Sequence, residues 1–113
     1  MHEMALCEGV LQVLEEYARK RGYTRVKTVW LEIGELAGVE VEAMRFGFDV
    51  VTRGTLAEGA ELRIIERPGE AWCPQCAKTV RVKQRFDACP DCDGYPLQVT
   101  GGEEMRVREL EVE

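Results

Sequence analysis

Residues 73–92 read CPQCAKTVRVKQRFDACPDC, and this stretch decides the architecture of the chain. It contains two Cys-x-x-Cys pairs, Cys73 with Cys76 and Cys89 with Cys92, twelve residues apart. Two such pairs that flank a short hairpin can place four thiolates tetrahedrally around one zinc ion. The spacing therefore predicts a zinc ribbon in which Zn(II) is structural.

Other chemistries of paired cysteines fit this stretch less well. A disulfide pair is disfavoured without a secretory signal peptide, and a redox Cys-x-x-Cys motif needs no duplication. Iron could occupy the same ligands, as in a rubredoxin-like electron carrier. Four thiolates close the coordination sphere and leave no position for an activated water, so a catalytic zinc is not expected.

The predicted ribbon has few apolar residues of its own. Val80 and Val82 indicate a short extended segment, and Phe86 is expected to pack beneath the metal. Metal binding is then expected to drive folding of the module. Pro68-Gly69 and Gly101-Gly102 flank the ribbon and are candidate hinges.

Apolar periodicity on both sides of the cysteines predicts the remaining elements. Residues 3–21 repeat apolar side chains at helical spacing and Gly22 supplies a stop, which indicates an amphipathic helix. Cys7 lies on the apolar face of this helix and is expected to be a small core residue. A second helix is expected at 41–54, and β-branched or alternating patterns predict strands at 24–33, 60–67 and 105–112.

Together these elements predict an α+β fold, with two helices packed on a small three-stranded sheet and the zinc ribbon inserted into it. The last strand needs sheet partners, so it is expected to return to the strands that precede the ribbon. The expected domains are residues 1–68, completed by the strand at 103–113, and a ribbon domain at 69–102.

A second candidate metal site lies at the start of the sequence, Met1-His2-Glu3, which contains the only histidine. A histidine at position two can chelate an ion through the Met1 amine, its own backbone amide and an imidazole nitrogen, nearly in one plane. Ni(II) and Cu(II) favour such tetragonal nitrogen ligation, whereas Zn(II) prefers a tetrahedron. The alternative is that these residues are simply an ordinary start of a cytosolic chain.

Composition limits the classes of function. The formal net charge of −6 becomes more negative when four thiolates bind one zinc ion, which argues against nucleic acid as the main partner. No cleavage signal or apolar stretch of about twenty residues is present, so a cytoplasmic protein without a membrane span is expected. Neither site offers a nucleophile with an orienting base, so an enzyme is not expected. A local basic cluster at Lys78, Arg81, Lys83 and Arg85 is typical of a solvated face.

Met1-His2-Glu3, the α/β segment, the two cysteine pairs and the closing strand together resemble the HypA/HybF family of hydrogenase nickel-incorporation proteins. The stretches EIGELAGV at 32–39 and TRGTLAEGAEL at 52–62 also look like that family, so the likeness covers nearly the whole chain. The resemblance implies a nickel metallochaperone that carries Ni(II) as cargo and Zn(II) as a structural ion. It further implies delivery to the large subunit of [NiFe]-hydrogenase together with the GTPase HypB. The alternative is a zinc-ribbon module that binds protein or nucleic acid without nickel transfer.

By the same resemblance, His2 is the principal nickel ligand and Glu3 contributes through its backbone or its side chain. Glu40 occupies the place of a further acidic ligand, although it could equally be a solvated carboxylate in the first turn of the second helix. Some relatives add a histidine from the zinc module, which this chain lacks. In a possible homodimer, His2 of another subunit could supply that imidazole.

Overall fold

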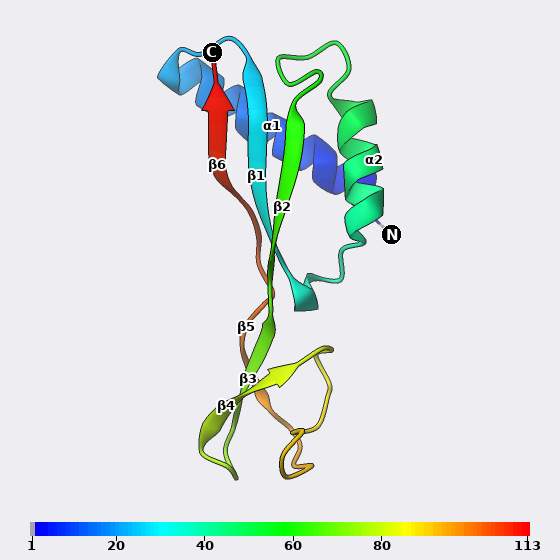
Figure 1. The fold of residues 1–113 in the computed structure, drawn as a ribbon, viewed down its shortest axis with the longest axis vertical. Coiled ribbons are helices and arrows are strands. Elements are labelled where there is room, and N and C mark those ends of the chain that lie inside the picture. Colours follow the sequence, from blue (N-terminus) through cyan, green and yellow to red (C-terminus); the bar gives the residue numbers. More distant parts are fainter. Residues whose placement is uncertain (1) are drawn as a thin grey trace. The chain divides into compact units, whose positions relative to one another are not determined.

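The computed structural model describes residues 2–113, which form two α-helices, a short 3₁₀ helix and two three-stranded sheets (Figure 1). Among these residues, neither α-helix is long and apolar enough to cross a membrane. The chain divides into two compact units, described separately below. The helical unit contains residues up to Leu31, Val39–Ile65 and Arg106–Glu113, and the cysteine unit contains Glu32–Gly38 and Glu66–Met105.

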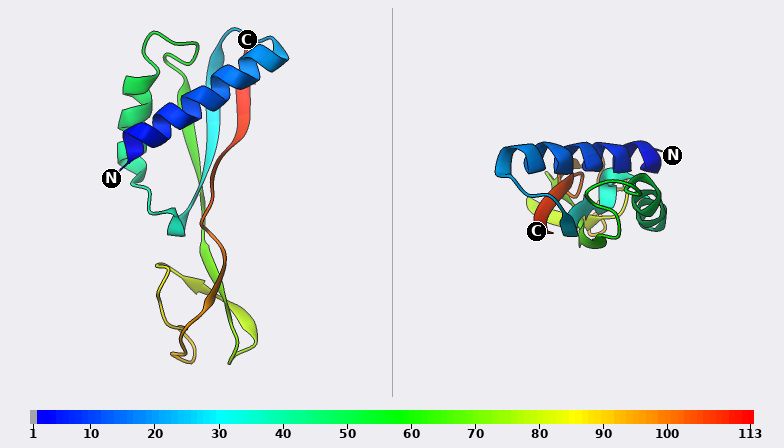
Figure 2. Two further views of the ribbon diagram at one scale, coloured as in Figure 1. Left: turned by 180° about the vertical axis from the view of Figure 1, so that it is seen from behind. Right: turned by 90° about the horizontal axis from the view of Figure 1, so that it is seen from above.

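The helical unit has the predicted α+β arrangement. Helix α1 (Glu3–Arg21) crosses behind the strands, and helix α2 (Val41–Val51) lies beside strand β2 (Figures 1 and 2). The strand order is β2-β1-β6. The prediction that the last strand returns to the strands preceding the cysteines is therefore confirmed. The strands are β1 (Val26–Gly34), β2 (Glu61–Arg67) and β6 (Met105–Val112), whose ends extend into the cysteine unit.

The α1–α2 contact forms the core of the helical unit beside the sheet. Helix α1 ends where Gly22 adopts a left-handed φ of 79° and donates its N–H to a carbonyl of the last turn. Cys7 is fully buried, and its Sγ lies 3.4 Å from the carbonyl oxygen of Met44 on α2. A Cβ added to Gly47 would lie only 3.1 Å from that sulfur. Cys7 is thus a core residue where two helices approach closely, as the sequence predicts.

The cysteine unit is built on three antiparallel strands, β3 (Gly69–Cys73), β4 (Lys78–Val82) and β5 (Gln98–Gly101). Their order is β4-β3-β5, with β3 in the centre. Cys73 pairs with Lys78 at the end of the β3–β4 hairpin. The extended segment predicted around Val80 is confirmed as β4.

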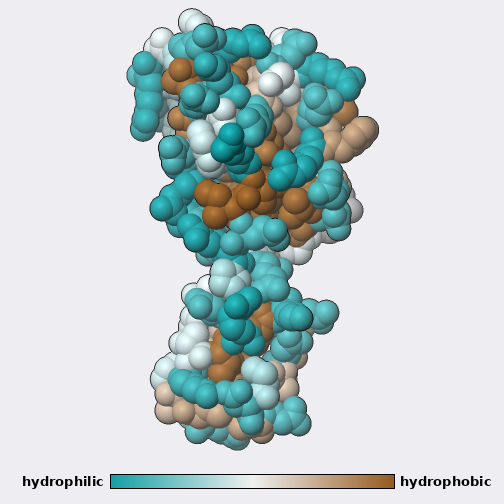
Figure 3. Space-filling view, in the orientation of Figure 1, coloured by the Kyte–Doolittle hydropathy of each residue, from teal (hydrophilic) through white to brown (hydrophobic). Residues whose placement is uncertain are grey.

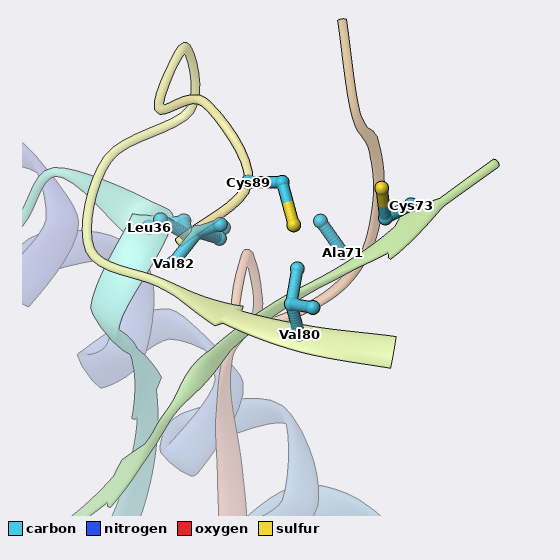
Figure 4. Close-up of a cluster of buried hydrophobic side chains, with 6 residues drawn as sticks. All are labelled: Leu36, Ala71, Cys73, Val80, Val82 and Cys89. Carbon is cyan, nitrogen blue, oxygen red and sulfur yellow. The ribbon is translucent and has the colours of Figure 1, made fainter. Parts of the chain in front are cut away.

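The buried core of the cysteine unit is small and includes two of the cysteines (Figure 4). Phe86 does not pack there, because its side chain is 80% exposed, and the prediction that it lies beneath the metal is wrong. Leu36 fills the core instead, from the 3₁₀ helix Glu35–Ala37 that follows β1. The buried members are Leu36, Ala71, Cys73, Val80, Val82 and Cys89.

Glycines allow three chain segments of the cysteine unit to touch backbone to backbone. A Cβ on Gly34 would collide with the carbonyl group of Gly102. A Cβ on Gly102, whose φ is 91°, would lie 2.6 Å from Gly69 Cα and 2.6 Å from the Pro68 carbonyl oxygen. The Gly34 N–H also donates to the Glu104 carbonyl at 2.7 Å. The junctions proposed as candidate hinges are therefore closely packed.

We expect Gly34→Ala to lower the free energy of unfolding by more than about 2 kcal/mol, because backbone atoms cannot rotate away from the added methyl group. Urea unfolding monitored by circular dichroism measures the change. Gly9→Ala is the matched control, because nothing lies within 4 Å of its Cβ position on α1. This control should raise stability by about 0.5–1 kcal/mol. Equal stability of the two variants would contradict the packing argument.

Candidate metal sites

The four predicted zinc ligands come together in the cysteine unit. The sulfur atoms of Cys73, Cys76, Cys89 and Cys92 all lie within 4.8 Å of one another. The Cys73–Cys92 separation is 3.6 Å and the Cys76–Cys89 separation is 3.9 Å. With metal–sulfur bonds of about 2.3 Å, a tetrahedral ion holds its ligands about 3.8 Å apart. The group therefore has the dimensions of a four-sulfur metal site.

The two Cys-x-x-Cys turns are built alike. In each turn, the Sγ of the first cysteine accepts a hydrogen bond from a backbone N–H two or three residues later in the chain, with an N–Sγ distance of 3.4 Å. The residue after each pair has a positive φ, 53° in the first turn and 62° in the second, and donates its N–H to the first cysteine's carbonyl at 2.8 Å. These bonds fix the conformation of the two turns that carry the sulfur atoms. The residues concerned are Cys73, Cys76 and Ala77, and Cys89, Asp91 and Asp93.

The crowding of the sulfurs affects their ionisation. The backbone N–H of Cys76 stabilises the Cys73 thiolate and lowers the pKa of Cys73 to about 7. The neighbouring sulfur of Cys92 and desolvation raise the pKa of Cys76 to about 12. All four groups can be thiolates together only if a cation lies among them. The electrostatics of the group thus favour a bound divalent ion.

The proposed nickel ligands lie at the other site, in the helical unit. His2 is the N-cap residue of α1, and its carbonyl accepts the Leu6 N–H at 2.9 Å. Its side chain is exposed and makes no capping hydrogen bond. Met1, the predicted amine ligand, lies outside the described residues.

The structure brings Glu3 and Glu40 together, although they are 37 positions apart. The Glu40 N–H donates to Glu3 Oε2 at 3.2 Å, so the starts of α1 and α2 are joined. The Glu40 side chain accepts the Glu42 N–H at 3.2 Å and caps α2. The bond from Glu40 is the largest cause of a lowered pKa at Glu3. Each carboxylate therefore already accepts a hydrogen bond from a backbone N–H, either of the N-cap residue of α2 or of its first turn.

Two further carboxylates position the strands that lead to the cysteines, and no sequence pattern indicates either of them. Glu35 Oε1 accepts the Gly69 N–H at 2.9 Å, immediately where β3 begins. Glu32 is 1% exposed and pairs with Arg67 at 2.7 Å. Both interactions join β1 and the following 3₁₀ helix to the segment that enters β3.

Comparison with known proteins gives a consistent result. The sequence profile of a family described as "Hydrogenase/urease nickel incorporation, metallochaperone, hypA" matches residues 1–112. The hydrogenase maturation factors HypA of Alkalilimnicola ehrlichii and Azotobacter chroococcum are 63% and 61% identical over 113 residues, which is the whole of both chains in each case. The solution structure of the Ni metallochaperone HypA from Helicobacter pylori has a TM-score of 0.72 at 24% identity, and the match covers 99% of this chain and 97% of that one.

The bond between Glu3 and the Glu40 N–H predicts a defined pH dependence. Because the folded-state pKa of Glu3 is lowered, this contribution to stability is complete above the ordinary glutamate pKa and is lost as the pH falls through the lowered value. The Glu40 amide proton should therefore shift with the titration of Glu3 in a pH series of NMR spectra. In Glu3→Ala, that titration should disappear, and the stability difference from the parent protein should vanish in acid. A Glu40 amide that titrates identically in both proteins would contradict the assignment.

Proposed function

This chain belongs to the HypA family of hydrogenase/urease nickel-incorporation metallochaperones, and from that premise we propose that it binds Ni(II) at its N-terminus and delivers it for maturation of [NiFe]-hydrogenase. The observation that carries the proposal is the contrast between its two donor sets. Four sulfur atoms lie within 4.8 Å of one another in the cysteine unit, whereas His2, the N-cap residue of α1, has an exposed imidazole. One set suits a permanent ion and the other suits a transferable ion.

The resident ion of the cysteine unit is proposed to be structural Zn(II), held by Cys73, Cys76, Cys89 and Cys92. Tetrahedral thiolate ligation is what Zn(II) prefers, and a closed set of four protein ligands is typical of structural zinc. The sulfur separations of 3.6 and 3.9 Å support this assignment. A bound Zn(II) ion would neutralise the thiolates and thereby stabilise the small core around them.

Nickel is proposed to be held by the Met1 amine, the His2 amide and imidazole nitrogens, and Glu3. The Glu3 side chain already accepts the Glu40 N–H, which favours a contribution from the Glu3 backbone. Glu40 is proposed as a further acidic ligand, because its N–H donates to the Glu3 side chain at the start of α1 and its own carboxylate caps α2. Nitrogen ligands in a plane favour Ni(II) over Zn(II), so the two sites select different ions.

The handover is proposed to involve the GTPase HypB and the large subunit of [NiFe]-hydrogenase, in the cytoplasm and without catalysis by this chain. An exposed terminal site suits this role, because a receiving protein can replace its ligands one at a time. A possible homodimer would bring two such sites into one particle. The alternative, a zinc-ribbon interaction module without nickel transfer, predicts no specific nickel binding.

Removing the imidazole tests the nickel site. We expect His2→Ala to lose the single specifically bound Ni(II) while it retains one zinc ion and the parent circular dichroism spectrum. Native mass spectrometry of untagged protein, titrated with nickel, reports both metals in one spectrum. Glu16→Ala is the control, because it replaces an exposed residue on the same helix. Unchanged nickel binding in His2→Ala would favour the alternative function, and loss of zinc would refute separate sites.

Removing one thiolate tests the structural ion. We expect Cys73→Ala to lose zinc and to disorder the cysteine unit, because the remaining ligands cannot complete the tetrahedron and the core is small. Amide NMR spectra should show collapsed signals for β3, β4 and β5 while those of α1 persist. Cys7→Ala is the control, since Cys7 lies outside the sulfur cluster and should leave the zinc content unchanged. Full zinc content in Cys73→Ala would contradict the assignment.

A further inference from the structure

Helix α1 is longer than the sheet beneath it is wide. Its 19 residues span about 28 Å, whereas the outer strands of a three-stranded sheet lie only about 10 Å apart. Its C-terminal end projects beyond β6, which is an edge strand of the sheet (Figures 1 and 2). Part of the helix therefore has no strand under it.

The apolar face of α1 shows the same mismatch. Cys7, Val10 and Leu14 on this face are at most 5% exposed. Tyr17, the next residue on the face, is 36% exposed, and the Arg21 guanidinium lies 5.4 Å from its ring centroid. The burial thus ends where the helix passes the last strand, although the apolar pattern continues.

A groove of about 590 Å³ occupies this position. One wall is formed by Tyr17, Arg21 and Tyr23, and the other by β6. The β6 residues that line it include the consecutive positions 107–110, which alternate between the two faces of the sheet. The groove therefore runs along the main-chain edge of the strand. Hydrophobic residues reach the surface among hydrophilic ones near the C-terminal end of β6 (Figure 3).

We propose that this groove binds an extended segment of a partner protein, which adds to β6 as a fourth strand beneath the overhanging end of α1. An edge strand can pair with a further strand through the N–H and C=O groups on its outer side, which is the recognition mode called strand addition. The added strand would lie about 4.8 Å beyond β6, under Tyr17. The inference extends beyond nickel transfer and does not depend on either metal site.

The charges of β6 define the partner. Arg106 and Arg108 are followed by Glu109 and Glu111, with apolar residues at the other positions from Met105 to Val112. Opposite charges directly across a strand pair stabilise it, and like charges destabilise it. An antiparallel partner should therefore carry basic residues opposite the two glutamates, followed by acidic residues opposite the two arginines.

The same pattern disfavours a second copy of this chain. In a two-fold antiparallel pair of β6 strands, side chains that lie opposite each other point to the same face of the sheet. The residue numbers of any two opposed residues therefore add up to an even number. If the two-fold axis passes through the pair at Arg108 or Glu109, that residue lies opposite its own copy in the second strand. A pair centred on Val107 opposes Arg106 to Arg108, and one centred on Leu110 opposes Glu109 to Glu111. Every central register therefore places like charges together.

The probe is the octapeptide Thr-Lys-Ile-Lys-Glu-Val-Glu-Thr, which is complementary to β6 read from Val112 to Met105. The control peptide, Thr-Glu-Ile-Lys-Lys-Val-Glu-Thr, has the same composition but places two like-charged pairs opposite β6 in either orientation. In NMR titrations of the zinc-loaded chain, we expect at least tenfold tighter binding of the probe. The amide shifts should map to β6 and to the last turn of α1.

Variants of the chain distinguish strand addition at β6 from nonspecific binding of the peptide. Tyr17→Ala should weaken probe binding at least fivefold, whereas Phe46→Ala should not, although Phe46 is 69% exposed on α2. Arg108→Glu should also weaken it. A peptide with lysine in place of its first glutamate, which faces position 108, should bind Arg108→Glu more tightly than it binds the parent chain. Circular dichroism checks that each variant is folded.

Three results would overturn the proposal. The first is equal affinity for the probe and the control peptide, and the second is a set of shifts that maps away from β6. The third is a dimer in analytical ultracentrifugation that Tyr17→Ala dissociates, because the groove would then be filled by a second copy. His2→Ala should bind the probe as tightly as the parent chain does, so failure of the nickel proposal can be told from failure of this one.

Discussion

The cysteine unit depends on the confinement of four sulfur atoms within 4.8 Å. Four thiolates at these separations repel one another strongly, and a cation removes that repulsion. Cys73 and Cys89 also belong to the buried core, which has only six members. Metal ligation and burial therefore involve the same residues, and neither is expected to persist without the other. The close contacts of Gly34, Gly69 and Gly102 hold together the segments that lead into and out of this core.

The N-terminal site follows a different physical logic. His2 is exposed, and the start of α1 is connected to α2 by the bond from the Glu40 N–H to Glu3. If the proposed nickel site lies here, its exposure would give it little preorganisation, which would limit affinity and favour exchange. The helix interface nearby is closely packed by contrast, because Cys7 and Gly47 let the two helices approach each other. An exposed imidazole beside two closely packed helices would suit the proposed role of binding an ion and then releasing it.

Local patterns in the sequence account for much of this arrangement. The Cys-x-x-Cys spacing identifies the sulfur group because each turn is built from adjacent residues, and helical periodicity with Gly22 locates α1. The roles of Leu36, Glu35 and Glu3 depend instead on partners at least 33 positions away, for which a single sequence contains no signal. The exposure of Phe86 has the same origin. Its side chain is hydrophobic, but the buried core is completed by Leu36 from a distant segment, and Phe86 stays exposed.

Helix α1 connects the two proposed activities of the helical unit. Its N-terminal end carries the proposed nickel ligands and its C-terminal end overhangs the β6 groove, about 28 Å away along 19 residues. A single bound strand cannot cover both ends of α1 at this separation. A strand bound at the groove would therefore leave His2 accessible to a metal recipient. Such a strand would also raise the local concentration of any recipient domain attached to it. The excess length of α1 over its sheet would thus give the proposed docking and the proposed metal exchange separate positions on one helix.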